Sequence, residues 1–301
     1  MPWHLLTSFG VLVNNLVNNL ASLSTKNGYN KTAISGVGIF KASDSTPRVP
    51  LCYSQGIIII VQGQKRVYFD QQSYDYNPDN YLVLTVPVPA ECETIVEVDK
   101  PLLSLVIDLD MGILGELVRV LDDHGHVRQH EKSLENKGLF ISQCTESFSC
   151  VVARLADCLS SPLQCDIIGK GLLREIFYHV LTGPQAAPLF ALVSHNTHLS
   201  RMERVLKHLH NSYQANLDVE QLAKMANMSS STFHRNFKQV TASSPIQYVK
   251  RIRLTRAREL LQDQGLKVKQ AAAQVGYESA TQFSREFSRY FGLSPSECAQ
   301  N

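Results

Sequence analysis

The sequence predicts an α+β fold in two domains: a small N-terminal β-barrel with flanking helices, and a C-terminal all-α domain with two helix-turn-helix motifs. Three observations predict it. Residues 34–108 are a series of short β-branched and aromatic runs separated by Gly, Pro, Asp and Asn, as in small barrels and sandwiches. From residue 112 onward, apolar residues recur at helical spacing. One helix-turn-helix pattern then occurs twice between residues 217 and 295.

The charge of the chain is unevenly distributed. Residues 1–199 hold 14 Lys and Arg against 19 Asp and Glu, whereas residues 200–301 hold 15 against 8. An acidic first part and a basic last part suit a regulatory domain joined to a nucleic-acid-binding domain. Two soluble domains with random charge would also fit this observation taken alone.

The N-terminal residues and the cysteines indicate the cellular compartment. The first 16 residues are apolar but lack a basic n-region and are interrupted by Asn, so we expect neither a signal peptide nor a membrane span. Leu12, Leu16, Leu20 and Leu23 predict an amphipathic helix that packs on its own domain. Seven cysteines without a C-x-x-C pair indicate reduced thiols in a cytoplasmic protein.

The strand-like segments follow from residue 34 onward. They are VGIFKA, GIIIIVQG, KRVYFD, NYLVLTVPV, ETIVEV and LLSLVIDL. Within them, IIIIVQGQKRVYFD is expected to form a hairpin with Gln62, Gly63 and Gln64 at the turn.

Residues 112–183 predict three helices, with Pro162 opening the third and Gly183-Pro184 ending it. Their apolar stripes would fit packing within their own domain. The segment 184–197 carries two prolines and no clear period, and is the predicted linker. The domains are therefore expected at 1–183 and 198–301.

The two helix-turn-helix copies align with each other. Their offset is 49 residues up to Tyr277 and 50 from Ser279 onward. The matched positions in the first copy are Ala223, Ala226, Met228, Ser229, Phe233, Arg235 and Phe237, and in the second Ala272, Val275, Tyr277, Ser279, Phe283, Arg285 and Phe287. The small residues allow close helix contact, the serines supply N-cap oxygens, and the phenylalanines form an apolar stripe.

The opposite face of each second helix carries residue types that hydrogen-bond bases or pair with phosphate. We predict base contact by Ser231, His234, Arg235, Thr281, Gln282 and Arg285, and phosphate contact by Lys238 and Arg289. An ordinary helical bundle with solvated polar faces is the competing interpretation, and the second registered copy counts against it. Between the copies, a helix from Pro245 carries a run of Lys and Arg, which is either a solvated face or close to phosphate.

The segment AAAQVGYESATQFSREFSRYFGLSP closely resembles the C-terminal signature of the AraC/XylS family of bacterial transcription regulators. The resemblance covers about the last hundred residues. It implies a seven-helix domain whose two recognition helices enter successive major grooves on one face of double-stranded DNA. Residues 34–110, including RVPLCYSQGIIIIVQGQKRVYFD, resemble the cupin-like N-terminal domain of one AraC-type subgroup. In such proteins the helices after the barrel form the dimer contact, which implies a homodimer.

A cupin-like barrel raises the possibility of an enzyme. Metal cupins use a His-x-His pair, a Glu and a further His, yet no histidine lies between His4 and His124. We therefore expect no metal, no cofactor and no catalysis. His124, His126 and His130 have a spacing that could hold a metal, but a solvated loop is the better interpretation. No G-x-S-x-G, Walker A or G-x-G-x-x-G pattern occurs.

A small barrel can instead hold a ligand. The candidates for lining it are Cys52, Tyr53, Tyr68, Tyr81, Thr85, Pro87 and Cys92. A one-residue slip in register would reverse every inward assignment, and plain core or surface aromatics remain the alternative for the tyrosines.

The sequence thus favours a dimeric regulator that binds DNA and an unknown small-molecule effector, with RNA polymerase as a further partner if it is an activator. No membrane is expected as a partner. A constitutive DNA-binding protein whose barrel only dimerises, and a barrel enzyme, stay open as alternatives.

Overall fold

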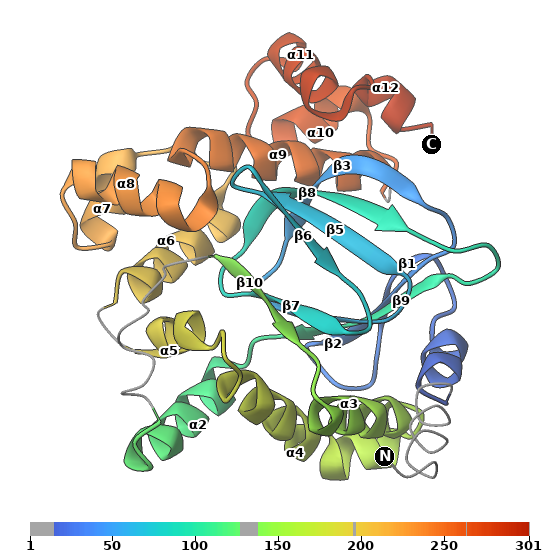
Figure 1. The fold of residues 1–301 in the computed structure, drawn as a ribbon. Coiled ribbons are helices and arrows are strands. Elements are labelled where there is room, and N and C mark those ends of the chain that lie inside the picture. The colour runs from blue at the N-terminus through green and yellow to red at the C-terminus, as the bar shows by residue number, and fades with distance from the viewer. Residues whose placement is uncertain (1–14, 127–137, 195–196, 263, 301) are drawn as a thin grey trace.

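The computed structural model describes residues 15–126, 138–194, 197–262 and 264–300. Two antiparallel β-sheets lie face to face in the N-terminal part, and helices from the C-terminal part lie along one side of them (Figure 1). The predicted α+β class with an N-terminal sheet domain and a C-terminal helical domain is confirmed. Within the described residues no backbone pairing joins the two sheets, so the predicted barrel is an open sandwich.

The larger sheet has six strands in the order β1-β2-β9-β4-β7-β10. Its strands are β1 (Gly28–Lys31), β2 (Val37–Ala42), β4 (Gly56–Gln62), β7 (Asn80–Leu84), β9 (Leu102–Asp108) and β10 (Leu139–Gln143). β4 is central and buried on both faces along most of its length, which explains its unbroken run of four isoleucines.

The smaller sheet has the order β3-β8-β5-β6. Its strands are β3 (Thr46–Tyr53), β5 (Gln64–Phe69), β6 (Gln72–Tyr76) and β8 (Val88–Ile95). Along β5, buried residues alternate with half-buried ones, because one face packs into the sandwich and the other faces outward. Lys65, Val67 and Phe69 are the inward residues of this strand.

The hairpin predicted around Gly63 is wrong. β4 pairs with β7 and β9, whereas β5 pairs with β6 and β8, so the two strands lie in different sheets. Gly63 has a φ of 85°, and a Cβ there would lie 3.1 Å from Leu102. Gly63 therefore lets the chain cross between sheets where a side chain would be strained and crowded.

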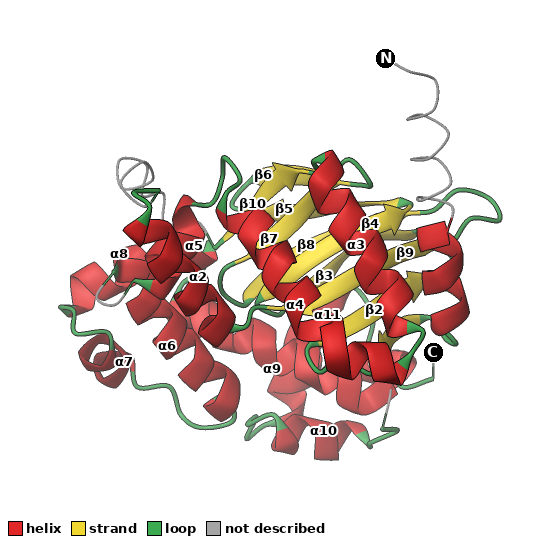
Figure 2. Cartoon of the chain, turned by 90° about the horizontal axis from the view of Figure 1, so that it is seen from below, coloured by secondary structure: helices red, strands yellow, loops and turns green. Residues whose placement is uncertain are grey.

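Helices cover the outer face of the six-stranded sheet (Figure 2). The three helices predicted between 112 and 183 are present as α2 (Met111–Asp123), α3 (Glu146–Leu159) and α4 (Pro162–Leu181), and α3 and α4 lie over the strands in this view. Residues 15–23 are also helical, with Leu16 and Leu20 buried, while the rest of the predicted N-terminal helix, including Leu12, lies outside the described residues. Within the described ranges, every helix is too short or too polar to cross a bilayer.

The segment expected to be a linker contains a short helix, α5 (Ala187–Val193), most of which is buried. Leu189 is fully buried and Phe190 nearly so. The chain therefore passes between the two parts through packed structure at residues 187–193.

The C-terminal part is all helical. It consists of α6 (His198–Ser212), α7 (Val219–Met225), α8 (Ser230–Thr241), α9 (Pro245–Gln262), α10 (Val268–Gln274), α11 (Ala280–Phe291) and α12 (Pro295–Cys298). In the described residues from 197 onward these are seven helices, the number that the family resemblance implies.

The helical part is docked directly on the sandwich. Tyr248 of α9 is fully buried and its hydroxyl donates a 2.8 Å hydrogen bond to the carbonyl oxygen of Pro87. Gly138, before β10, approaches α8 so closely that a Cβ on it would lie 2.3 Å from the carbonyl oxygen of Val240. One continuous apolar core includes both Val88 of the sandwich and Val240 and Tyr248 of the helices.

Candidate nucleic-acid interface

Two helix pairs, α7 with α8 and α10 with α11, repeat each other at the predicted offsets. The first helix of each pair begins at Val219 and Val268, 49 residues apart, and the second at Ser230 and Ala280, 50 apart. Ser229 and Ser279 cap the second helices, accepting from the amides of Thr232 and Gln282. The predicted N-cap role of these serines is confirmed.

The turns also correspond. Asn227 and Gly276 both have a left-handed backbone, with φ of 53° and 87°. Gly276 has a second constraint, because a Cβ there would lie 2.3 Å from the carbonyl oxygen of Gln214. The second turn is therefore held against the loop that follows α6.

The apolar stripe of each second helix faces the core. Phe233 and Phe237 of α8 and Phe283 and Phe287 of α11 are all fully buried. Successive rings pack with centroids 5.5 Å apart in α8 and 5.4 Å apart in α11. Burying one side of each helix in this way leaves the other side to solvent.

All eight predicted contact residues lie on the exposed sides. These are Ser231, His234, Arg235 and Lys238 on α8, and Thr281, Gln282, Arg285 and Arg289 on α11. The structure brings them together as two sets, one on α8 and one on α11. The hydroxyl of Ser231 lies 3.3 Å from that of Ser229, and Gln282 donates a 3.4 Å hydrogen bond to Glu286.

The helix between the pairs, α9, is tied through its basic residues to the second pair and to the loop between α6 and α7. Lys250 forms a 2.8 Å ion pair with Glu286 of α11. Arg253 donates to four main-chain carbonyls: those of Tyr213, Gln214 and Ala215 after α6, and that of Gly276 in the second turn. The guanidinium of Arg253 therefore joins these backbone segments. The sequence offered two interpretations for this basic run, a solvated face or phosphate contact, and neither applies to Arg253.

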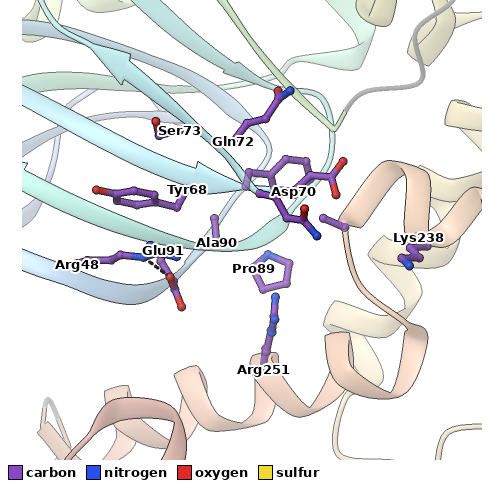
Figure 3. Close-up of a pocket in the computed structure, with 13 residues that line it drawn as sticks. Arg48, Tyr68, Asp70, Gln72, Ser73, Pro89, Ala90, Glu91, Lys238 and Arg251 are labelled. Carbon is purple, nitrogen blue, oxygen red and sulfur yellow. Dashed lines mark hydrogen bonds and ion pairs between the residues drawn. The ribbon is translucent and has the colours of Figure 1, made fainter.

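A cavity of about 540 Å³ lies between the sandwich and the helices (Figure 3). One wall carries Arg48 and Tyr68 of the four-stranded sheet, and the other carries Lys238 of α8 and Arg251 of α9. The Arg48 guanidinium pairs with Glu91 and lies 4.0 Å from the centre of the Tyr68 ring. The sequence showed no functional signal for Arg48. Arg251 was expected only as one member of the basic run, either solvated or close to phosphate.

Two family descriptions match the chain. An AraC-type transcriptional regulator N-terminus matches residues 33–188, and a helix-turn-helix domain matches residues 222–301. The first alone covers more than half of the chain. The chain belongs to the AraC/XylS family of transcriptional regulators.

Curated relatives of this AraC-type chain match about a third to a half of it. The Msm operon regulatory protein of Streptococcus mutans is 32% identical over 96 residues, which is 32% of this chain and 34% of that protein. The lactose operon transcription activator of Staphylococcus xylosus is 25% identical over 147 residues, 49% of this chain and 52% of that protein. The chain thus aligns with about a third to a half of the length of these relatives.

Solved structures agree with the fold over most of the chain. ToxT from Vibrio cholerae, in a structure described as bound to an unsaturated fatty acid, has a TM-score of 0.62. The match covers 87% of this chain and 94% of that one at 16% sequence identity. At that identity the likeness shows a shared fold.

The residues predicted to line an effector site in the AraC-type sandwich lie in different surroundings, and the effector site itself stays a prediction. Tyr53 and Cys92 are buried inside the sandwich, where the Tyr53 hydroxyl lies 3.0 Å from that of Tyr76. Burial, together with the neighbouring Tyr76 and Cys92, raises the pKa of Tyr53 far above its ordinary range. Lys65 is also buried here, with its ammonium 4.1 Å from the centre of the Phe40 ring.

The other candidates lie elsewhere. Tyr81 stacks on Phe148 of α3 with centroids 4.4 Å apart, and the hydroxyl of Thr85 donates to the carbonyl oxygen of Gly138. Tyr68 lines the cavity between the domains. Burial raises the pKa of the partly exposed Cys52 to about 12, so its thiol stays protonated at neutral pH. Which strand face each residue occupies depends on pairings across two sheets, and sequence spacing does not encode them.

Of the predicted histidine cluster, His130 lies outside the described residues. The Nδ1 atom of His124 lies 2.8 Å from the carbonyl oxygen of Val120. Among the described residues no group of three or more His, Cys, Asp or Glu is arranged to hold a metal ion.

Proposed function

We propose that this AraC-type regulator reads a specific DNA sequence with both recognition helices and that a small molecule controls the reading. Base contacts come from Ser231, His234 and Arg235 of α8 and from Thr281, Gln282 and Arg285 of α11, with Lys238 and Arg289 on phosphates. The supporting observation is that two registered helices bury their phenylalanines and leave these eight side chains exposed. Such a helix fits the major groove, where side chains of these types distinguish base pairs.

Selection from a pool of random duplex DNA with the full-length chain tests this function. We expect enrichment of a site with two conserved blocks for each monomer that binds, because each monomer carries two reading helices. Affinity for the enriched site should fall steeply as salt rises, through release of counterions from the phosphates. Failure to enrich any sequence at low salt would contradict the proposal.

We propose activation as the outcome of binding. Two relatives support it by name, the lactose operon transcription activator and the RhaS transcriptional activator of Escherichia coli, which is 32% identical over 101 residues. An activator in the cytoplasm would contact RNA polymerase, so transcription of a template carrying the selected site should rise when the protein is added. A fall in transcript would make it a repressor.

We propose that the protein is a homodimer that pairs through α4. Leu163 and Ile167 are 68% and 71% exposed, one helical turn apart, and Tyr178 is 45% exposed further along the helix. Gly171 between them has open space where a Cβ would stand, which permits close approach of a second helix. Exposed apolar side chains in such a row are typical of a protein interface. In sedimentation equilibrium, Ile167→Glu should convert the dimer to monomer, while Val120→Glu, at a 47% exposed site on α2, should not.

Effector control is the regulatory part of the proposal. It is supported by the direct docking of the DNA-binding helices on the sandwich, since a ligand that binds one docked arrangement better shifts the population toward it. The ToxT structure described with a bound unsaturated fatty acid supports effector binding within this fold. A sandwich used only for dimerisation would favour a wholly apolar interior. The interior of this sandwich contains the buried polar residues Lys65 and Thr94, which supports effector binding instead.

A further inference from the structure

We propose that the cavity between the sandwich and the helices binds a small polar anion, carrying a phosphate or carboxylate group, that Arg251 and Lys238 hold, while Arg48, paired with Glu91, lines the opposite wall. This lies outside the sandwich, unlike the interior site expected from the sequence. Lys238 is also the phosphate contact proposed for α8, so an anion here competes with DNA for it. That regulatory consequence rests on the proposed function, whereas the binding itself does not.

The cavity is built from both domains. Its lower wall is α9, from which Arg251 points toward Pro89, and its side wall is the end of α8 with Lys238 (Figure 3). Its upper wall is the outer face of the four-stranded sheet with Arg48 and Tyr68. A ligand here touches the recognition helix and the regulatory sheet at the same time.

The charges favour an anion. Lys238 and Arg251 form no ion pair with any carboxylate of the described residues. Of the two carboxylates that line the cavity, Glu91 is neutralised by Arg48, which leaves Asp70 against two free cations. A guanidinium and an ammonium group on adjoining walls are suited to grip a phosphate or a carboxylate.

The turn above the cavity supplies polar groups at a conformational cost. Asp70 and Gln71 join β5 to β6 with φ of 49° and 63°, a left-handed pair that normally selects Asn or Asp followed by Gly. Gln71 stands where Gly would relieve strain, and its side chain lines the cavity with those of Gln72 and Ser73. Backbone strain retained beside polar side chains is a feature of ligand sites.

The lining also limits what kind of anion fits. Amide and hydroxyl groups of Gln71, Gln72 and Ser73 suit the hydroxyls of a sugar phosphate or hydroxy acid. Apolar contact comes from Pro89, Ala90, Ala242 and the rings of Tyr68 and Phe69, whereas the other eight lining residues are polar or charged, which does not suit a long acyl chain. We therefore assign a compact polar anion and not a fatty acid.

Isothermal titration calorimetry of the full-length protein without DNA tests the assignment. Inorganic phosphate and glucose 6-phosphate serve as probes at constant ionic strength, with glucose as the uncharged match and decanoate as the apolar anion. We expect saturable binding of both phosphates in the millimolar range or tighter, and weaker or no binding of glucose and decanoate. Arg251→Gln and Lys238→Gln should each weaken phosphate binding about tenfold, the loss of one charge-assisted hydrogen bond.

Two matched controls separate the site from general charge effects. Arg119→Gln on α2 and Lys170→Gln on α4 each remove one exposed cation far from the cavity and should leave phosphate binding unchanged. Absence of saturable phosphate binding, equal losses in all four variants, or preference for decanoate would each overturn the proposal. Because the titration contains no DNA, such a result would not contradict the proposed DNA-reading function, which the selection experiment tests separately.

Discussion

The Tyr248 hydroxyl and the carbonyl oxygen of Pro87, 161 residues apart in sequence, are joined by a 2.8 Å hydrogen bond. The Nε2 atom of His210 lies 2.9 Å from the same hydroxyl. Since the single proton of Tyr248 is directed at Pro87, His210 donates to the tyrosine from Nε2. Three elements are thereby connected: α6, the helix α9 between the two reading units, and the sandwich.

Removing this hydroxyl should weaken the docking of the two domains. In Tyr248→Phe the carbonyl of Pro87 and the Nε2–H of His210 lose their buried partner, which costs about 1–3 kcal/mol. Urea denaturation of the full chain should show this loss in the free energy of unfolding. Tyr29→Phe, at a 45% exposed ring, is the control and should change it by less than about 0.5 kcal/mol. Equal effects would mean that the Tyr248 bond contributes nothing specific.

The same connection makes stability sensitive to acid. Burial, with a smaller contribution from Arg256, lowers the pKa of His210 from 6.5 to about 4. Its folded-state pKa is below its unfolded value, so the unfolded chain binds the proton more readily between pH 6.5 and 4. His210 therefore lowers stability as pH falls through that window, and the loss is complete below pH 4.

His210→Gln keeps an Nε2–H donor without a titrating ring. The variant should lose less stability than the wild type between pH 7 and pH 4, measured by urea denaturation at each pH. Parallel curves for the two proteins would show that His210 is not the titrating group.

The second turn should tolerate no side chain at Gly276. Gly276→Ala adds a Cβ about 2.3 Å from the carbonyl oxygen of Gln214, at a φ of 87°. Gly292→Ala has the same kind of backbone, with a φ of 76°, but no atom within 4 Å of its Cβ. We expect about 1–2 kcal/mol of destabilisation for Gly292→Ala from backbone strain alone, and clearly more for Gly276→Ala. Similar losses in thermal unfolding would argue against the close contact.

The exposed arginines of the two recognition helices should read bases. Arg235→Ala and Arg285→Ala should each cost about 1–3 kcal/mol at the selected site and relax specificity at one base pair. Arg289→Ala should weaken selected and random DNA by a similar factor, because phosphate contact carries no sequence information. Fluorescence anisotropy with both DNAs distinguishes these outcomes. If Arg235→Ala lowered both affinities equally, its base-reading role would be wrong.

Elements whose determining residues lie close together in sequence were predicted well, and those that depend on distant segments were not. The helices of both reading units were predicted closely because Ser229 and Ser279 cap them and the buried phenylalanines repeat at i, i+4, all within a few residues. The hairpin at Gly63 failed because both flanking strands pair with segments distant in sequence. Register across two sheets likewise decides that Tyr53 points inward and Tyr68 outward.

The cavity between the domains could not be predicted from local pattern. Its cations, Arg48 and Arg251, are 203 residues apart in the printed sequence, and only the docking of α9 on the four-stranded sheet brings them to one space. The sequence did not indicate that Tyr248 contacts the sandwich either, because a tyrosine at helical spacing is an ordinary core residue.

The central claim is that one chain reads two successive major grooves. α9 has 18 residues, about 27 Å at 1.5 Å per residue, which is close to one turn of B-DNA. The decisive measurement is DNase I footprinting and affinity on the selected site with five base pairs inserted between its two conserved blocks. The insertion turns the second groove to the opposite face and moves it along the axis, so we predict loss of one protected block and of tight binding. Unchanged affinity and protection with five extra base pairs would show that only one of the two units reads DNA.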